Sequence, residues 1–127
     1  MSSIETVRAA INNQISDGRQ KIKAHVQIES NNFPQKGIFL FYDDEGASLA
    51  LGKFTRVGLY TQPIQIAVAH STYEKSRQVA FSLFEFINTL KITGIVLTPL
   101  ASPVYAGINL VRSQYIYTID YNMKGDQ

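Results

Sequence analysis

The segment PIQIAVAHSTYEKSRQVAFSLFEFINTL, residues 63–90, changes from a strand period to a helix period within a few residues. Apolar Ile64, Ile66 and Val68 alternate with less apolar residues, and a period of two is typical of a strand with one buried face. After His70 the apolar residues recur at helical spacing, which predicts an amphipathic helix over residues 72–90. We therefore expect a strand that leads directly into a helix.

The junction between this strand and this helix carries a helix-start signal. Ser71 stands where an N-cap hydroxyl accepts a hydrogen bond from the helix backbone, and Glu74 follows three residues later, as in a capping box. We expect Ser71 to be the N-cap. The unit holds no evident catalytic group, so function has to be inferred from surfaces and from resemblance.

Length and composition are those of a globular domain. The 127 residues fit one domain, and the net charge of +2 is too small to indicate a nucleic-acid or membrane partner by field alone. The lack of cysteine excludes disulfides and thiolate chemistry. Residues 1–20 show no apolar core of a signal peptide, and no apolar run approaches the ~18 residues of a membrane helix. We expect synthesis in the cytosol and no membrane partner.

Three elements are predicted before residue 43. Residues 1–18 form a helix with a narrow apolar stripe that ends at Gly18, since glycine readily adopts the left-handed conformation. Residues 22–28 alternate as a half-buried strand does, with a continued helix as the alternative. Residues 38–42 are apolar on both faces, which predicts a central strand covered on both sides.

The segment from residue 43 to residue 62 shows no convincing period and is interpreted as a long loop or arm, which can hold a short hairpin. Later a strand is predicted over residues 95–98, a Pro- and Gly-rich link over 99–107, and an amphipathic strand over 115–122. Residues 123–127 are expected to be a frayed tail.

These elements predict one α+β domain over residues 1–127. We expect a mostly antiparallel or mixed sheet of four to five strands, with an N-terminal helix and one long helix packed on the sheet.

The motifs that suggest bound ligands are weak. Five residues separate Gly46 from Gly52 where a phosphate-binding loop has four, and Phe54 stands where that motif needs Ser or Thr. Asp43 and Asp44 begin an acidic cluster that lacks the alternating spacing of a calcium loop, so a solvated turn is the preferred interpretation.

The two histidines also give little sign of catalysis. His25 and His70 have no partner at metal-ligand spacing, and His70 is interpreted as a structural or interface side chain. No serine has a recognisable base in a known order. We predict no catalytic residue, no metal and no cofactor.

Two surfaces are considered for binding. A basic and aromatic face for nucleic acid could combine Arg112, Tyr115 and Tyr117 with lysines and arginines elsewhere, namely Lys21, Lys23 and Arg56. Aromatic core residues with scattered surface charge are the preferred explanation of that pattern. Phe81 lies on the polar side of the predicted helix, where a large aromatic residue can anchor a subunit contact.

Three segments together resemble the tail terminator, or tail completion, proteins of long-tailed bacteriophages. They are FPQKGIFLFYDDEG, PIQIAVAHSTYEKSRQVAFSLFEFIN and SPVYAGINLVRSQYIYTIDYNM. More narrowly, they are similar to minor capsid proteins encoded by phages and prophages of Gram-positive bacteria. The match spans residues 33–123 and depends on the order and spacing of all three segments. Members often carry arginine where this chain has His70.

The resemblance implies a structural protein without enzymatic activity. Such a subunit forms a ring, typically hexameric, that caps the tail tube, stops its polymerisation and joins it to the head connector. Its implied partners are copies of itself, the major tail tube protein and head connector proteins, and viral DNA passes through the lumen without sequence-specific binding. Its implied location is the head-proximal end of the virion tail, after assembly in the host cytoplasm.

Interfaces would then carry the function. The expected contact residues are the apolar anchors Phe81, Tyr60 and Phe54 and the rim charges Asp43, Asp44, Lys53, Arg56 and Arg112. A head-completion or connector adaptor protein and a tail-tube subunit are the alternatives from the same setting. A small ligand-binding domain or an enzyme is the alternative from another class.

Overall fold

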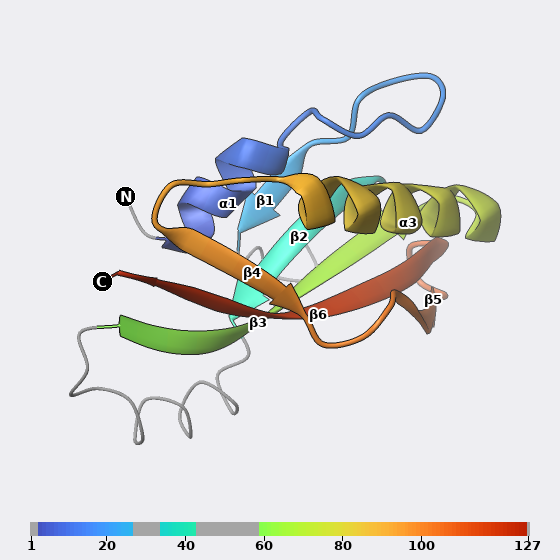
Figure 1. The fold of residues 1–127 in the computed structure, drawn as a ribbon. Helices are drawn as coiled ribbons and strands as arrows, with labels where there is room; N and C mark the ends of the chain where they lie inside the picture. The colour runs from blue at the N-terminus through green and yellow to red at the C-terminus, as the bar shows by residue number, and fades with distance from the viewer. Residues whose placement is uncertain (1–2, 27–33, 43–58, 127) are drawn as a thin grey trace.

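Two long strands pair with each other and form the middle of the sheet. In the computed structural model, which describes residues 3–26, 34–42 and 59–126, β3 (Leu59–His70) and β6 (Gln114–Asp126) run antiparallel. Their register extends from Leu59 opposite Asp126 to His70 opposite Tyr115. The other strands extend the sheet on both sides of this pair (Figure 1).

Four shorter strands complete a mixed sheet of six. β2 (Gly37–Tyr42) pairs antiparallel with β3, and β1 (Ala24–Val26) pairs parallel with β2. β4 (Ile95–Pro99) and β5 (Val104–Asn109) both pair antiparallel with the other side of β6. The sheet thus has six strands rather than four to five. The predicted link over residues 99–107 is wrong, because β5 begins within it.

Both described helices pack on the same face of the sheet (Figure 1). They are α1 (Ser3–Ile11) and α3 (Tyr73–Thr89). Their apolar side chains meet those of the strands in one core, which includes Ile4, Val7, Ile11, Ile38, Leu40, Ile64, Ile66, Val79, Leu83, Ile119 and Tyr121. The predicted α+β domain, with a short N-terminal helix and one long helix on a mixed sheet, is confirmed. Neither described helix is long and apolar enough to cross a bilayer.

β2 is buried on both faces, as its sequence predicts. Ile38, Phe39 and Leu40 have no exposed surface. Ile38 and Leu40 belong to the core beneath the helices, whereas Phe39 packs with Ala67 and Ala69 on the opposite face. Burial of a whole Ile, Leu or Phe side chain stabilises a fold by about 1.5–3 kcal/mol, so this short strand contributes strongly to stability.

The start of α3 differs by one residue from the prediction. Thr72 is the N-cap, and its hydroxyl accepts a hydrogen bond from the backbone N–H of Lys75 at 3.2 Å. The N–H of Ser71 instead donates to Nδ1 of His70 at 2.8 Å. The prediction that Ser71 is the N-cap is wrong, because the extended backbone at Thr72 (φ −133°, ψ 154°) starts the helix at Tyr73 and leaves Ser71 one residue before the cap.

The N-terminal helix is shorter than the predicted residues 1–18. It ends at Ile11, and Asn13 adopts a left-handed backbone with a φ of 60°. Beyond this point the chain pairs with itself, since Ile22 donates its N–H to the carbonyl of Ile15 at 2.8 Å. Ile15 is still buried, but from a turn rather than from a helix. Gly18 has the expected positive φ within that turn, not at the helix end.

The predicted frayed tail and long loop are both partly wrong. Met123 is buried, and β6 continues to Asp126 because β3 and β4 pair with its two sides. Leu59 begins β3, so the predicted loop or arm over residues 43–62 ends in a strand. Its remaining part, residues 43–58, lies outside the described residues.

A buried hydrogen bond between Asp17 and His70 fastens the turn after α1 to the end of β3. Nε2 of His70 lies 2.8 Å from Oδ2 of Asp17, and both side chains are almost fully buried. Nδ1 of His70 accepts the N–H of Ser71, so the ring proton is on Nε2 and is donated to the carboxylate. Nζ of Lys75 also donates to the backbone carbonyl of Asp17 at 2.7 Å.

The Asp17 carboxylate is stabilised in its charged form. The hydrogen bond from His70 lowers the pKa of Asp17 far below its ordinary value of 3.8, and the backbone N–H groups of Gln20 and Arg19 lower it further. Burial acts in the opposite direction but is outweighed. A carboxylate with a lowered pKa stabilises the folded state above its unfolded pKa, and this contribution is lost as the pH falls below that value.

Replacement of Asp17 by Asn tests this hydrogen bond. Whichever way the amide is oriented, its NH₂ group faces either the Nε2–H of His70 or the backbone N–H groups of Arg19 and Gln20. We expect the free energy of unfolding in urea at pH 7 to fall by about 1.5–3 kcal/mol. The matched control is Asp120→Asn at an exposed site, which should change it by less than about 0.5 kcal/mol.

The same pair of proteins has a predictable dependence on pH. The difference in unfolding free energy between wild type and Asp17→Asn should be constant above about pH 5 and should shrink as the pH falls through about 4, because the unfolded wild type then binds a proton at Asp17 while the folded protein keeps the carboxylate ionised. Urea unfolding at several pH values measures it. If the difference in unfolding free energy stays constant down to pH 3, the lowered pKa of Asp17 is contradicted.

Candidate functional site

The outer edge of the sheet opposite β1 is built from two successive strands. β4 pairs with the last part of β6, and β5 pairs with its first part. Among the described strands, neither β4 nor β5 has a partner on its outer side. Such an edge offers backbone N–H and C=O groups to another chain, so it is either protected or used for binding.

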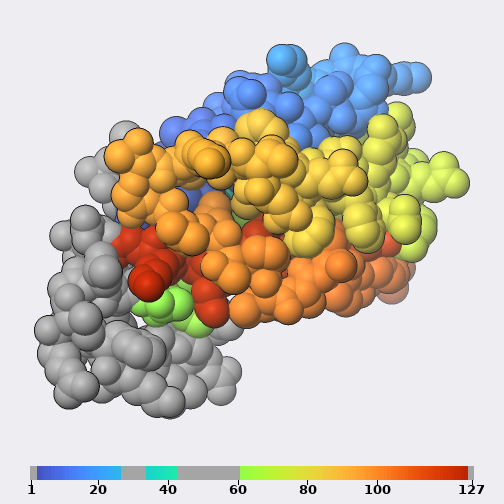
Figure 2. All heavy atoms as spheres, in the orientation of Figure 1, coloured from blue at the N-terminus to red at the C-terminus, as the bar shows by residue number. Residues whose placement is uncertain are grey.

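The large apolar side chains that the described structure leaves exposed gather along this edge. Eight are exposed, and all except Tyr73 lie between residues 96 and 111. Single exposed apolar residues are common, but a group of them indicates a contact surface. Figure 2 shows this part of the chain, in orange, at the surface. We call the group the apolar edge; it consists of Val96, Leu100, Val104, Tyr105, Ile108, Leu110 and Val111.

The turn between β5 and β6 presents the most exposed members of the apolar edge. Leu110 is 79% exposed and Val111 is 95% exposed. Oδ1 of Asn109 accepts hydrogen bonds from the backbone N–H groups of Val111 and Arg112, at 3.1 and 3.3 Å. This Asx-type turn fixes the backbone, so the two apolar side chains are presented by a preformed structure.

The base of this turn is anchored to the segment before β2. The side chain of Gln114 is fully buried, and its Nε2 donates to the carbonyls of Pro34 and Gln35 at 2.7 and 3.2 Å. Gln35 in turn donates its side-chain amide to the carbonyl of Ser113 at 3.3 Å. These bonds join residues about eighty positions apart in sequence, and they limit how far the turn can move.

A cluster of tyrosines joins the apolar edge to α3. Tyr105 of β5 lies 5.4 Å from Tyr117 and 5.1 Å from Tyr73 between ring centroids. The hydroxyl of Tyr117 donates to the hydroxyl of Tyr73 at 2.7 Å. Burial raises the pKa of Tyr117, and the hydrogen bond with Tyr73 raises it further. The cluster therefore positions β5 against the first turn of the helix.

Phe81 belongs to the same packing and does not stand alone on a polar face. Its ring is half-buried, 6.3 Å from the ring of Tyr117, and the guanidinium of Arg77 lies 4.6 Å from its centroid. The expectation of an exposed aromatic anchor at this position is wrong, because β5 and β6 bring their tyrosines up to the helix. A role of Phe81 in a subunit contact stays a prediction.

The other predicted contact residues are divided between described and undescribed parts. Arg112 is half-buried in the turn that carries Leu110 and Val111, so the structure places it beside the apolar edge. The backbone of Tyr60 pairs with Gly125 in β3, but its side chain is outside the described part. The remaining predicted residues also lie outside the described ranges, namely Asp43, Asp44, Lys53, Phe54 and Arg56.

Sequence reasoning missed most of the apolar edge. A Pro- and Gly-rich segment was expected to be a link, which hid the alternation of β5. One signal was available: Leu110 and Val111 are large apolar residues between Asn109 and Ser113, in a turn where polar residues are usual. An apolar pair in such a turn does not contribute to a core, so it indicates a contact surface.

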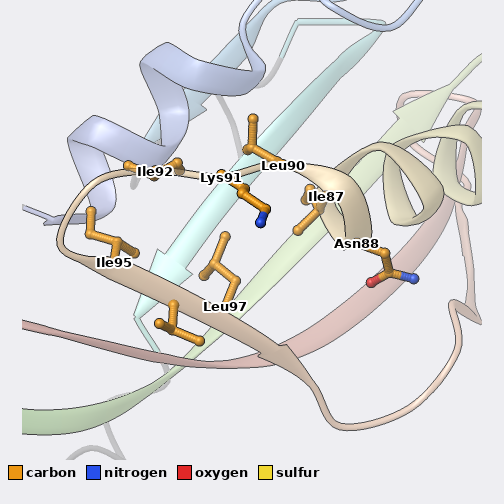
Figure 3. Close-up of a pocket in the computed structure, with 8 residues that line it drawn as sticks. Ile87, Asn88, Leu90, Lys91, Ile92, Ile95 and Leu97 are labelled. Atoms are coloured by element: carbon orange, nitrogen blue, oxygen red, sulfur yellow. The ribbon is translucent and has the colours of Figure 1, made fainter.

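A groove lies at the start of β4 (Figure 3). It lies between the last turn of α3 and β4 and has a volume of about 300 Å³. Apolar side chains form most of its wall, and Asn88 and Lys91 stand at its side. Val96 belongs both to the groove and to the apolar edge. The apolar edge thus includes a concave part at β4 in addition to the exposed turn between β5 and β6.

The buried Asp17, His70 and Ser71 group resembles a proton-relay arrangement but is engaged structurally. Oγ of Ser71 lies 3.2 Å from Nδ1 of His70, yet the same nitrogen already accepts the backbone N–H of Ser71 at 2.8 Å. Its lone pair is therefore occupied and is not free to activate the hydroxyl. Within the described ranges, no three His, Cys, Asp or Glu side chains form a group that could hold a metal ion.

Comparison of the chain with models of known protein families and with curated protein sequences gives no match.

Two Tyr→Phe replacements separate a bonded hydroxyl from an unbonded one. Tyr117→Phe removes the bond to Tyr73 and should lower the free energy of unfolding by about 1 kcal/mol. Tyr121→Phe removes a buried hydroxyl that has no hydrogen-bond partner in the described structure, so it should leave stability unchanged or raise it by up to about 1 kcal/mol. Urea unfolding measures both. A greater loss for Tyr121→Phe would contradict this reading of the two sites.

Proposed function

We propose that this chain is a ring-forming structural subunit of a bacteriophage virion, similar to a tail terminator. The observation that carries the proposal is the apolar edge, because a preformed turn with two exposed apolar side chains is suited to contact with another protein. The resemblance to tail terminator proteins supports it from the sequence. Its three segments contain β2, the β3–α3 unit and the β5–β6 hairpin.

The proposed subunit contact is heterologous. The apolar edge occupies one edge of the sheet, and the opposite edge, at β1, is short and of different chemistry. An edge that meets a different surface on the next copy generates a ring when the rotation closes. Each contact can be of moderate strength, because the last contact of a closed ring is intramolecular.

The remaining parts of the proposal follow from the resemblance. The ring caps the tail tube, stops addition of the major tail protein and joins the tube to the head connector. Viral DNA passes through its lumen without sequence-specific contacts. This function depends on binding surfaces, and it needs neither a catalytic group nor a cofactor.

The test of assembly is a double substitution at the exposed turn. Light scattering and electron microscopy of the purified wild type should show a closed ring. Leu110→Asp with Val111→Asp should weaken association by about a hundredfold or more, because two apolar anchors are lost. The unfolding free energy of the monomer should change by less than about 0.5 kcal/mol, since both side chains are exposed.

The matched control places the same added charge elsewhere. Gln78→Asp with Ser82→Asp adds two carboxylates to the exposed side of α3 and should leave the ring intact. Equal loss of assembly in both variants would show a charge effect and would remove the apolar edge from the proposal. Long filaments of the wild type would indicate a tail-tube subunit, and a monomer at all concentrations would overturn the proposal.

A further inference from the structure

The face of the sheet opposite the helices carries a concentration of positive charge near β1. The alternation of residues 21–25 turns Ile22 and Ala24 into the core, where both are buried. The intervening side chains, Lys21, Lys23 and His25, therefore point away from the core. A pocket of about 350 Å³ lies there, lined by these three residues and by Gln20, Ile22, Pro34 and Lys36.

No described carboxylate lines this pocket. Of the two described acidic residues nearest in sequence, Asp17 is buried and bonded to His70, and Glu5 forms an ion pair with Arg8. Within the part of the chain that the structure describes, the ammonium groups of Lys21, Lys23 and Lys36 have no acidic partner. No described carboxylate offsets their mutual repulsion, so a bound anion would lower the energy of the site.

The backbone that carries these cations is well fixed. Lys23 accepts a hydrogen bond from the N–H of Ile38 at 3.0 Å, and Lys21 forms a bridge with Ser16. The carbonyl of Pro34, which also lines the pocket, accepts a hydrogen bond from the buried amide of Gln114. The backbone of the pocket wall is therefore fixed by bonds to three other parts of the fold, and the lysine side chains extend from these fixed positions.

His25 adds a hydrogen-bonding group to the wall. Its ring stacks on Phe39 of β2, with 5.4 Å between centroids and 20° between planes. Burial lowers the pKa of His25, and the positive charges of Lys23 and Arg8 lower it further. Lys23, which lines the pocket, thus also acts electrostatically on His25.

We propose that this pocket binds phosphate groups through Lys21, Lys23, Lys36 and His25. Lysine ammonium groups bind phosphate as point charges, and several of them around one cavity suit a multiply charged anion better than a single carboxylate. The phosphate can belong to a small phosphorylated compound or to the backbone of a nucleic acid. This inference does not depend on ring formation, because no residue of the apolar edge lines the pocket.

The experiment compares two double variants with the same loss of charge. Lys21→Gln with Lys23→Gln removes two cations from the pocket, and Lys91→Gln with Lys124→Gln removes two exposed lysines elsewhere. Thermal unfolding is measured in pyrophosphate against sodium chloride of equal ionic strength and pH. Pyrophosphate should raise the melting temperature of wild type and control, and the pocket variant should need about tenfold more of it for the same rise.

A second arm identifies the source of the phosphate. Fluorescence anisotropy with a short DNA duplex is measured over a range of salt concentrations. If a nucleic acid is the ligand, the pocket variant should bind the duplex more weakly than the control and with a smaller salt dependence. Binding of pyrophosphate without any difference on DNA would assign the site to a small phosphorylated compound.

Two results would overturn the inference. Equal weakening of both double variants, in both arms, would show a general effect of net charge and no site. Absence of binding to either pyrophosphate or DNA by the wild type would show that the pocket holds no phosphate. Circular dichroism of all variants confirms that the exposed substitutions leave the fold intact, so neither result can be attributed to unfolding.

Discussion

The antiparallel pairing of β3 with β6 is the constraint on which the rest of the structure depends. Ile66 lies opposite Ile119, and Ile64 lies opposite Tyr121, so the apolar faces of both strands point toward the helices. A shift of one residue would turn one of these sets to the other face. The register is therefore fixed by burial, and every further element is positioned by it.

Each side of this pair is completed in a different way. On the side of β3, the short and largely buried β2 is followed by the edge strand β1, which the outward-pointing Lys21 and Lys23 precede. On the side of β6, two strands share one partner, and their outer sides carry apolar residues. One scaffold thus exposes two surfaces of opposite character, one suited to apolar contact and the other to anions.

Periodic segments were predictable because burial of one face leaves a local trace in the sequence. The strand that contains Ile64 and Ile66, the helix that follows it, and the doubly buried β2 were all predicted correctly. The predicted bounds of elements were wrong where pairing with another segment overrides the local pattern. The first helix ends early because residues 13–22 pair with themselves, and the last residues remain in a strand because β3 and β4 hold both sides of them.

The candidate sites were much less predictable than the fold. Phe81 was expected to be exposed, but Tyr117 of β6 packs against it. The exposed pair Leu110 and Val111 was overlooked because no period marks a turn. Lys21 and Lys23 could be placed on one side of a strand, whereas their association with Lys36 required the pairing of β1 with β2.

The sequence by itself determined the kind and order of the main elements, since alternation and helical spacing depend on neighbours within a few residues. Only the tertiary structure decided which elements meet. It joined Asp17 to His70 across 53 positions, placed β4 and β5 on one strand, and gathered cations around one cavity. The physical reason is that local patterns record which face is buried, but not which distant segment buries it.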